Sequence, residues 1–119
     1  MTNKRFGRIG DSPVIGAGTW AEDATCAVSA TGHGEFFIRY AAAHDIAARM
    51  AYGGRSVAQA AHEVIHERLQ FVGGEGGVIA IDVHGNATLP FNTAGMYRGY
   101  ITAEGKTHVA IYGESKADA

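Results

Sequence analysis

Glycine is the residue that most restricts what this chain can fold into. Seventeen of its 119 residues are glycine, about twice the ordinary share. They occur singly or in pairs between apolar runs rather than as a low-complexity tract. Because glycine adopts backbone conformations that other residues avoid, and lets backbones approach closely, this distribution predicts short elements separated by tight turns.

Composition limits the class of protein. Hydrophobic residues make up 46% and charged residues 18% of the chain, which indicates one globular domain over 1–119 rather than a disordered segment. The formal net charge of -2, without a basic cluster, argues against a nucleic-acid partner. No apolar run approaches the roughly 20 residues of a membrane span, and no signal peptide is expected. The single cysteine, Cys26, excludes an intrachain disulfide and fits a cytoplasmic protein.

The first half of the chain predicts strands followed by a helix. Residues 1–11 are polar and indicate a loop, whereas 13–18 and 25–31 are apolar and indicate two short strands. Residues 35–52 are alanine-rich and apolar over most of a helical circumference, which predicts a helix buried on a broad face. The glycine pair at 53–54 is a typical helix C-cap.

A second helix and a run of strands follow. Ser56, with Gln59 three residues later, forms a capping-box pattern that predicts a helix to about residue 71. The strands expected after it are 78–83, 87–91, 96–102 and 107–112. Because short turns join antiparallel strands, we predict an α/β fold in which two helices cover one face of an antiparallel sheet.

The segment 62–66 reads H-E-x-x-H, a pattern in which two histidines bind zinc and the glutamate acts as a general base. On the predicted helix, however, Glu63 and His66 fall on the solvent side. A third ligand would have to come from Glu75 or His84, which the pattern does not place nearby. We therefore interpret the segment as a solvated helix face and expect no metal site.

Two other candidates have structural interpretations. Residues 16–21 match the glycine pattern of dinucleotide-binding turns, but that site needs a helix to begin in the turn, and a strand-like segment follows instead. Cys26 lies inside an apolar strand, which favours a buried structural cysteine over a nucleophile.

Two loops carry groups suited to binding an amino acid. In residues 7–13, Arg8 offers a fork for a carboxylate and Asp11 offers the opposite charge for an ammonium group. At the corner after the second strand, the Thr31 hydroxyl and the Gly32 amide could converge on an oxyanion. The alternatives are an Arg–Asp surface pair and an ordinary strand-to-helix turn.

Three separated motifs resemble those of plant-type L-asparaginases and isoaspartyl peptidases, a family of N-terminal-nucleophile hydrolases. They are G-R-I-G-D-S-P at 7–13 with G-A-G at 16–18, T-G-x-G-E at 31–35, and L-P-F-N-T-x-G-M-Y-R at 89–98. The resemblance covers essentially the whole chain and matches the β subunit. The third motif favours this branch over the related glycosylasparaginases, which share the first two.

The resemblance implies roles for individual residues. Arg8 would hold the α-carboxylate and Asp11 the α-ammonium group of an aspartyl substrate, while Thr31 and Gly32 would form the oxyanion site. The fold it implies is part of an αββα sandwich, and it implies no cofactor and no metal site among these residues. The substrate-binding residues expected from the motifs are Arg8, Ile9, Gly10, Asp11, Thr31, Gly32, His33 and Gly34.

The chain departs from the family pattern at its start. The family's β subunit begins with a catalytic threonine and a strand hairpin, and Met1 matches a position beyond both. We therefore expect the nucleophile, those two strands and the α subunit to be absent. Thr2, which loss of Met1 would expose, falls in a loop beyond the hairpin and is not expected to be the nucleophile. Without these strands, unpaired sheet edges and an uncovered apolar face are expected.

Three functional hypotheses follow from the sequence. The chain is a fragment of an amidohydrolase acting on L-asparagine and isoaspartyl dipeptides, inactive alone; or it is active with a partner chain that supplies the threonine; or it is a non-enzymatic amino-acid-binding module. A glycosylasparaginase-type fragment is the alternative within the enzyme class. The resemblance implies partners as well: the α subunit, the N-terminal segment of the β subunit and a homo-oligomer of αβ units.

Overall fold

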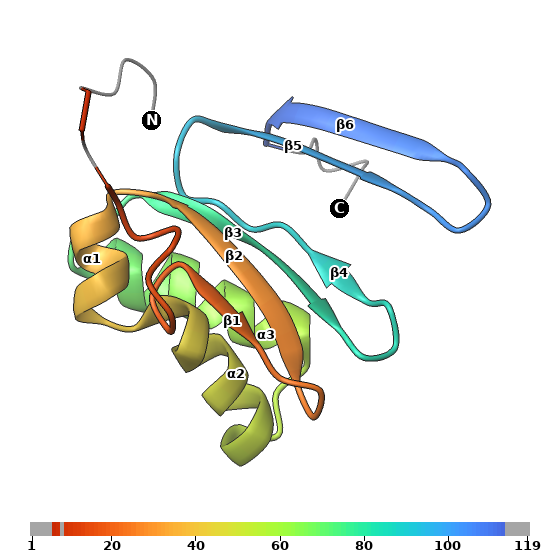
Figure 1. The fold of residues 1–119 in the computed structure, drawn as a ribbon, viewed down its shortest axis with the longest axis horizontal. Coiled ribbons are helices and arrows are strands. Elements are labelled where there is room, and N and C mark those ends of the chain that lie inside the picture. Colours follow the sequence, from red (N-terminus) through yellow and green to blue (C-terminus); the bar gives the residue numbers. More distant parts are fainter. Residues whose placement is uncertain (1–5, 8, 114–119) are drawn as a thin grey trace.

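The computed structural model describes residues 6–7 and 9–113, and within them the strands form two antiparallel groups (Figure 1). One is a sheet with the order β1-β2-β3-β4, and the other is a β5–β6 hairpin. The strands are β1 (Thr19–Ala21), β2 (Cys26–Gly32), β3 (Gly76–Asp82), β4 (Ala87–Thr88), β5 (Gly95–Ile101) and β6 (Thr107–Tyr112).

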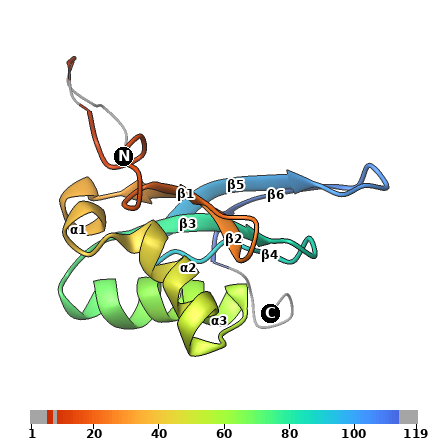
Figure 2. The ribbon, with the colours of Figure 1, turned by 60° about the horizontal axis from the view of Figure 1, so that its bottom comes forward.

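The helices occupy the chain between β2 and β3. They are α1 (Gly34–Arg39), α2 (Ala42–Gly53), α3 (Val57–His62) and the π-helical segment η1 (Glu63–Leu69), which continues α3. Figure 2 shows the helices on one side of the β1–β4 sheet and the β5–β6 hairpin on the other side. The fold is therefore mixed α/β with antiparallel strands, as predicted, but the strands form two groups rather than the single sheet that the sequence predicted.

The core lies between the helices and the inner face of the sheet. Along β2, Cys26, Val28 and Ala30 are buried while the residues between them are exposed, the alternation of a strand covered on one face. The largest fully buried side chains are Phe37, Ile46, Ile65, Leu69, Val64 and Val78. Burial of Cys26, predicted from its apolar strand, is confirmed, and that burial raises the pKa of its thiol.

The outer face of the sheet is apolar and partly open. Ile79 and Ile81 of β3 point to this side, and their side chains are 50% and 45% exposed. A groove of about 370 Å³ runs between this face and Tyr100 of the hairpin. Helices therefore cover one face of the sheet only, as the sequence predicted.

The strand predicted at 13–18 is wrong. These residues form consecutive turns, in which the amide of Val14 donates to the carbonyl of Asp11 and that of Ala17 donates to the carbonyl of Val14. The carbonyls of Gly16 and Ala17 accept instead from the amides of His44 and Ala43 at the start of α2. The segment therefore supplies hydrogen-bond acceptors for free amides at the start of α2, which has no side-chain cap.

The helix predicted over 35–52 is broken in two. Ala41 has a φ of 47°, the left-handed conformation, and ends the turn that follows α1. Nothing in the run of alanines at 41–43 indicates a break. The tertiary hydrogen bonds from α2 to the 16–17 turn provide the compensating contacts.

The second helix begins where the capping box predicted. Ser56 Oγ accepts from the amide of Gln59, and Gln59 Oε1 accepts from the amide of Ser56. Helical residues run from 57 to 71, which confirms the predicted end of this helix. The π-helical conformation of Glu63–Leu69 was not predicted.

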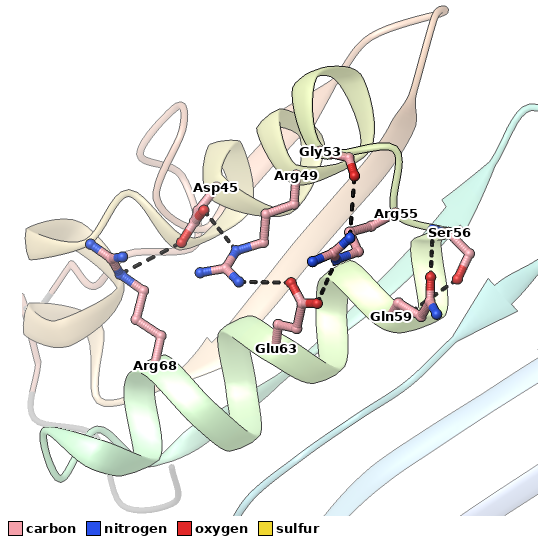
Figure 3. A network of polar contacts seen from close by, with 8 residues as sticks. All are labelled: Asp45, Arg49, Gly53, Arg55, Ser56, Gln59, Glu63 and Arg68. Carbon is pink, nitrogen blue, oxygen red and sulfur yellow. Dashed lines mark hydrogen bonds and ion pairs between the residues drawn. The ribbon is translucent and has the colours of Figure 1, made fainter.

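Ion pairs join this second helix to α2 (Figure 3). Arg49 donates to Asp45 at 3.0 Å and to Glu63 at 2.8 Å, and Arg55 donates to Glu63 at 2.7 Å. Arg68 lies 3.6 Å from Asp45. These partly exposed charges hold the two helices together along the surface that faces away from the sheet.

The C-terminal strands match the prediction with shifted ends. The strand predicted at 78–83 begins earlier, at Gly76, and those predicted at 96–102 and 107–112 are β5 and β6. The strand predicted at 87–91 pairs regularly only at 87–88, with an isolated bridge from Phe91 to Gly77. Among the described residues, no helix has the length and apolar character needed to cross a membrane.

Candidate functional site

The first loop of the predicted site places its carboxylate inside the protein. Asp11 is only 3% exposed, whereas Gly10 and Ile9 lie on the surface. Ser12 Oγ donates to the carbonyl of Ala30 at 3.0 Å, which fastens the loop to the end of β2. Arg8, the predicted carboxylate ligand, lies outside the described residues.

Two glycines make room for Asp11. A Cβ added to Gly34 would lie 2.9 Å from the Asp11 amide nitrogen and 3.0 Å from its Oδ1. A Cβ added to Gly18 would lie 2.2 Å from the Asp11 carbonyl oxygen. Neither position leaves space for a side chain, so the two glycines set the depth at which the Asp11 carboxylate sits.

The corner at the end of β2 is a second place of close backbone approach. Gly32 has a φ of 139°, and a Cβ there would lie 2.5 Å from the Cα of Gly76 on β3. The amide of His33 donates to the carbonyl of Glu75 at 2.9 Å. Thr31 is exposed on the outer face of the sheet, while His33 is half-buried and Gly34 is buried.

Strand geometry gives the direction of the Gly32 amide. Along an antiparallel strand, successive amides point to opposite edges. The amide of Ala30 donates to the carbonyl of Gly18 on the β1 side, and that of His33 donates to Glu75 on the β3 side. The amide of Gly32 therefore points to the β1 side, where the loop containing Asp11 lies.

The fold thus brings the two predicted loops together. The turns before β1 lie against the start of α1 and the end of β2 (Figure 1). There the Asp11 carboxylate packs against Gly34, and the Gly32 amide faces the same loop. A buried carboxylate beside a directed amide can bind an ammonium group and stabilise a developing negative charge a short distance away.

The contributions of Ser12 and Gly18 were missed in the sequence analysis. Both lie within the quoted motifs, but their contacts join residues from different elements. The sequence offered two signals for these contacts. One is a serine directly after Asp11, and the other is a glycine seven residues after it.

The H-E-x-x-H segment has other partners. Both carboxylate oxygens of Glu63 accept from arginines, and these hydrogen bonds from Arg49 and Arg55 hold the pKa of Glu63 below its ordinary value. His62 is exposed, and its ring centroid lies 4.7 Å from that of His66. Burial, and then the neighbouring His62, lower the pKa of His66. Among the described residues no three histidine, cysteine, aspartate or glutamate side chains gather as a metal site would require.

The fold and this corner fit one class of protein. A mixed α/β arrangement of antiparallel strands with helices on one face is consistent with part of an N-terminal-nucleophile hydrolase. A family model described as Asparaginase matches residues 1–111. The chain belongs to this asparaginase family.

Curated relatives are similar over nearly the whole chain. An isoaspartyl peptidase of Escherichia coli is 56% identical over 114 residues, which are 96% of this chain and 36% of that protein. A putative isoaspartyl peptidase/L-asparaginase of Dictyostelium discoideum is 55% identical over 101 residues, 85% of this chain and 29% of that protein. A probable isoaspartyl peptidase/L-asparaginase of Arabidopsis thaliana is 46% identical over 112 residues, 94% of this chain and 34% of that protein. The chain therefore spans about a third of the length of these relatives.

Proposed function

We propose that this chain is the substrate-binding part of an amidohydrolase that cleaves L-asparagine and β-aspartyl (isoaspartyl) dipeptides. The names of the relatives include both activities. The observation that carries the proposal is the buried Asp11 carboxylate, packed on Gly34 on the side to which the Gly32 amide points. We place the aspartyl end of the substrate in this corner.

The two charged groups of the first loop hold the substrate's α-carbon. Asp11 accepts hydrogen bonds from the α-ammonium group, and Arg8 donates to the α-carboxylate. Ile9 and Gly10 join these two residues and border the substrate. His33 and Gly34 form the opposite wall, in which Gly34 packs against the Asp11 carboxylate. A site that binds both the α-ammonium and the α-carboxylate group selects an α-amino acid rather than a simple amide.

The second loop acts on the bond that breaks. The Thr31 hydroxyl and the Gly32 amide donate to the side-chain carbonyl oxygen of the substrate as it becomes an oxyanion. The family resemblance implies a threonine nucleophile, freed by autoproteolysis, whose own α-amino group takes its proton. Its oxygen adds to the carbonyl carbon, the C–N bond breaks and the amine leaves with a proton. Water then hydrolyses the resulting ester. We assign this threonine to a segment of the relatives' length outside these residues.

The remaining assembly is part of the same proposal. We propose that 1–119 form one partial domain of an αββα sandwich, whose other layers come from an α subunit and an N-terminal β-subunit segment. The open apolar groove beside Ile79 and Ile81 supports a second layer on that side. We further propose an oligomer of αβ units in the cytoplasm.

A chimeric enzyme tests the proposal. In this chimera the present chain replaces the matching 36% of the Escherichia coli isoaspartyl peptidase. We expect it to release ammonia from L-asparagine and to cleave a β-aspartyl dipeptide. A folded chimera that binds aspartate but cleaves neither substrate would support the amino-acid-binding module instead, and preference for a glycosylated asparagine would support the glycosylasparaginase alternative.

Variants of the two loops should have different kinetic effects. Arg8→Ala leaves the substrate carboxylate unpaired, which costs about 2–5 kcal/mol of binding and raises KM by at least about thirtyfold. Thr31→Val removes one oxyanion donor and lowers kcat on the order of a hundredfold, with less change in KM. Steady-state kinetics of the chimera measure both, with Thr107→Val on the distant strand β6 as the control. An unchanged KM in Arg8→Ala would contradict the assigned role of this arginine.

A further inference from the structure

Asn92 lies between the sheet and the π-helical segment and makes hydrogen bonds to both. Its side-chain Oδ1 accepts from the amide of Gly76 at 2.8 Å, and its own amide donates to the carbonyl of Gly76 at 3.0 Å. Its Nδ2 donates to the carbonyls of Ile65 at 3.0 Å and Gly74 at 2.8 Å. Every polar group of this side chain therefore has a partner.

The contacts with Gly76 replace a neighbouring strand. Gly76 is the first residue of β3, and its amide and carbonyl both point away from β2 towards Asn92. The neighbouring residue Gly77 forms an isolated bridge with Phe91, so the pairing continues to Asn92. At Asn92 the side chain supplies the acceptor that a backbone carbonyl would normally provide. Asn92 thus holds the amide and the carbonyl of Gly76 on the edge of β3 that faces away from β2.

Gly32 is packed on the near side of Gly76. The two residues are directly opposite in the β2–β3 register, in a pair without mutual hydrogen bonds, whose Cα atoms approach to about 4.5 Å. A Cβ on Gly76 would lie 2.3 Å from the carbonyl oxygen of Thr31, and one on Gly32 would lie 2.4 Å from the carbonyl oxygen of Glu75. The two backbones touch without side chains between them, so a shift of Gly76 displaces Gly32.

Gly74 and Ile65 tie this contact to the helix. The π-helical conformation of Glu63–Leu69 includes Ile65, whose carbonyl accepts from Asn92. A side chain that bonds to a helix carbonyl is a recognised cause of local departures from regular α-helix, and such π-helical turns are frequent near functional sites. The asparagine is therefore connected both to β3, which flanks the Thr31–Gly32 corner, and to the π-helical segment.

We propose that Asn92 is a positioning residue for the oxyanion site. Through the hydrogen bond from the Gly76 amide to its Oδ1, it sets the place of Gly76 and hence the direction of the Gly32 amide. This inference rests on the proposed function of Gly32, but the chain of contacts does not depend on it. Asn92 itself does not touch the substrate.

Two substitutions separate positioning from simple support of the helix. Asn92→Ala removes all side-chain hydrogen bonds. Asn92→Asp keeps the acceptor for the Gly76 amide but replaces the two donors with an acceptor that faces the carbonyls of Ile65 and Gly74, so it breaks the contact with the helix. If Asn92 positions Gly32, the aspartate variant should resemble the wild type at the corner. If Asn92 only holds the helix, both variants should be equally impaired.

Amide exchange on the 119-residue chain measures the corner directly. The His33 amide donates to Glu75, next to Gly76, so we expect it to exchange about tenfold faster in Asn92→Ala and close to the wild-type rate in Asn92→Asp. Asn86→Ala is the matched control, since that side chain contacts Asp82 in an exposed turn. Unchanged His33 exchange in Asn92→Ala, or equally fast exchange in both variants, would overturn the proposal. If Asn92→Ala does not fold, the aspartate variant alone decides it.

The chimeric enzyme gives the kinetic readout. Asn92→Ala should lower kcat at least tenfold with less change in KM, and Asn92→Asp should restore most of it, with active-site titration correcting for unfolded enzyme. Loss of kcat that titration accounts for entirely would indicate a structural role only and would overturn the proposal. An inactive wild-type chimera would contradict the proposed function, whereas the exchange measurement would still decide the role of Asn92.

Discussion

The position of Asp11 depends on two glycines, because a side chain at either of them would occupy the space of Asp11. Its carboxylate is buried because Gly34 and Gly18 have no Cβ to occupy the same space. The loop is then fixed by Ser12, which donates to the carbonyl of Ala30. The position of the charge is therefore a property of two glycines in other parts of the chain.

Gly34→Ala is expected to displace Asp11. The added methyl group would lie 2.9 Å from its amide nitrogen, and relieving such overpacking costs about 1–3 kcal/mol. We expect KM for L-asparagine to rise about tenfold in the chimera while the protein stays folded. Gly53→Ala is the control, since the nearest atom to its added Cβ is Arg55 Cγ at 3.8 Å. Equal KM values for the two variants would show that Asp11 does not bind the substrate.

The sequence indicated some of these residues and not their contacts. The oppositely charged Arg8 and Asp11 three residues apart suggested a site for an amino acid, and the glycines suggested close approaches. The pairing of Asp11 with Gly34, or of Gly32 with Gly76, depends on which strands become neighbours. The local sequence pattern does not say which strands become neighbours. For this reason Asn92 was recognised as part of the third motif, but its contacts with Gly76, Ile65 and Gly74 were not predicted.

Among the elements, the starts of α2 and α3 are determined in different ways, one by distant residues and the other by local ones. The start of α3 is set by a capping box within four residues, and the sequence predicted it correctly. The break at Ala41 is set by hydrogen bonds to the turn at Gly16 and Ala17, far away in the sequence. A helix end that is capped by side chains close to it in the sequence can be predicted. A helix end whose amides donate to carbonyls far away in the sequence cannot.

Acid should weaken the contact between α2 and η1. The pKa of Glu63 is held below its ordinary value of 4.5 by hydrogen bonds from Arg49 and Arg55. Because the folded-state pKa is the lower one, this stabilisation is present above pH 4.5 and is lost as the pH falls through the lowered value. Glu63→Gln should therefore flatten the fall in the free energy of unfolding below about pH 5, measured by urea titration at several pH values.

Glu67→Gln is the matched control for that experiment. Glu67 is exposed on the same helix, and no ion pair of Glu67 is among those that join the helices. We expect the Glu67 variant to retain the wild-type slope. The same loss of slope in both variants would mean that the helix surface as a whole, rather than the arginine network, gives the acid dependence.

At the scale of the whole molecule, one core joins helices and sheet. Phe37 of α1 is completely buried, and a Cβ on Gly76 would lie 2.7 Å from its ring. The sequence predicted this helix–sheet layer because apolar periodicity reports burial. It did not predict that the hairpin would form a separate group from the β1–β4 sheet, since pairing between groups leaves no local pattern.

Two phenylalanines test where the stability of the chain lies. Phe37→Ala should cost about 3–5 kcal/mol, a large share of the 5–15 kcal/mol typical of a domain. Phe71→Ala, at a side chain that is 90% exposed, should stay within about 0.5 kcal/mol of the wild type. Thermal unfolding followed by circular dichroism measures both. A small effect at Phe37 would mean that the helices contribute little to the fold.

Every helix in the described part of the chain lies between β2 and β3, and this placement has a consequence for the order of folding. These central strands are joined by residues 33–75, so their pairing closes a long loop, and the entropy of closing it opposes early strand contact. Helical turns and the arginine contacts between α2 and η1 are more local, and once formed they shorten the flexible path between the strands. The corner at Gly32 and Gly76, where that loop closes, is then assembled late, after the helices that separate its two halves have formed.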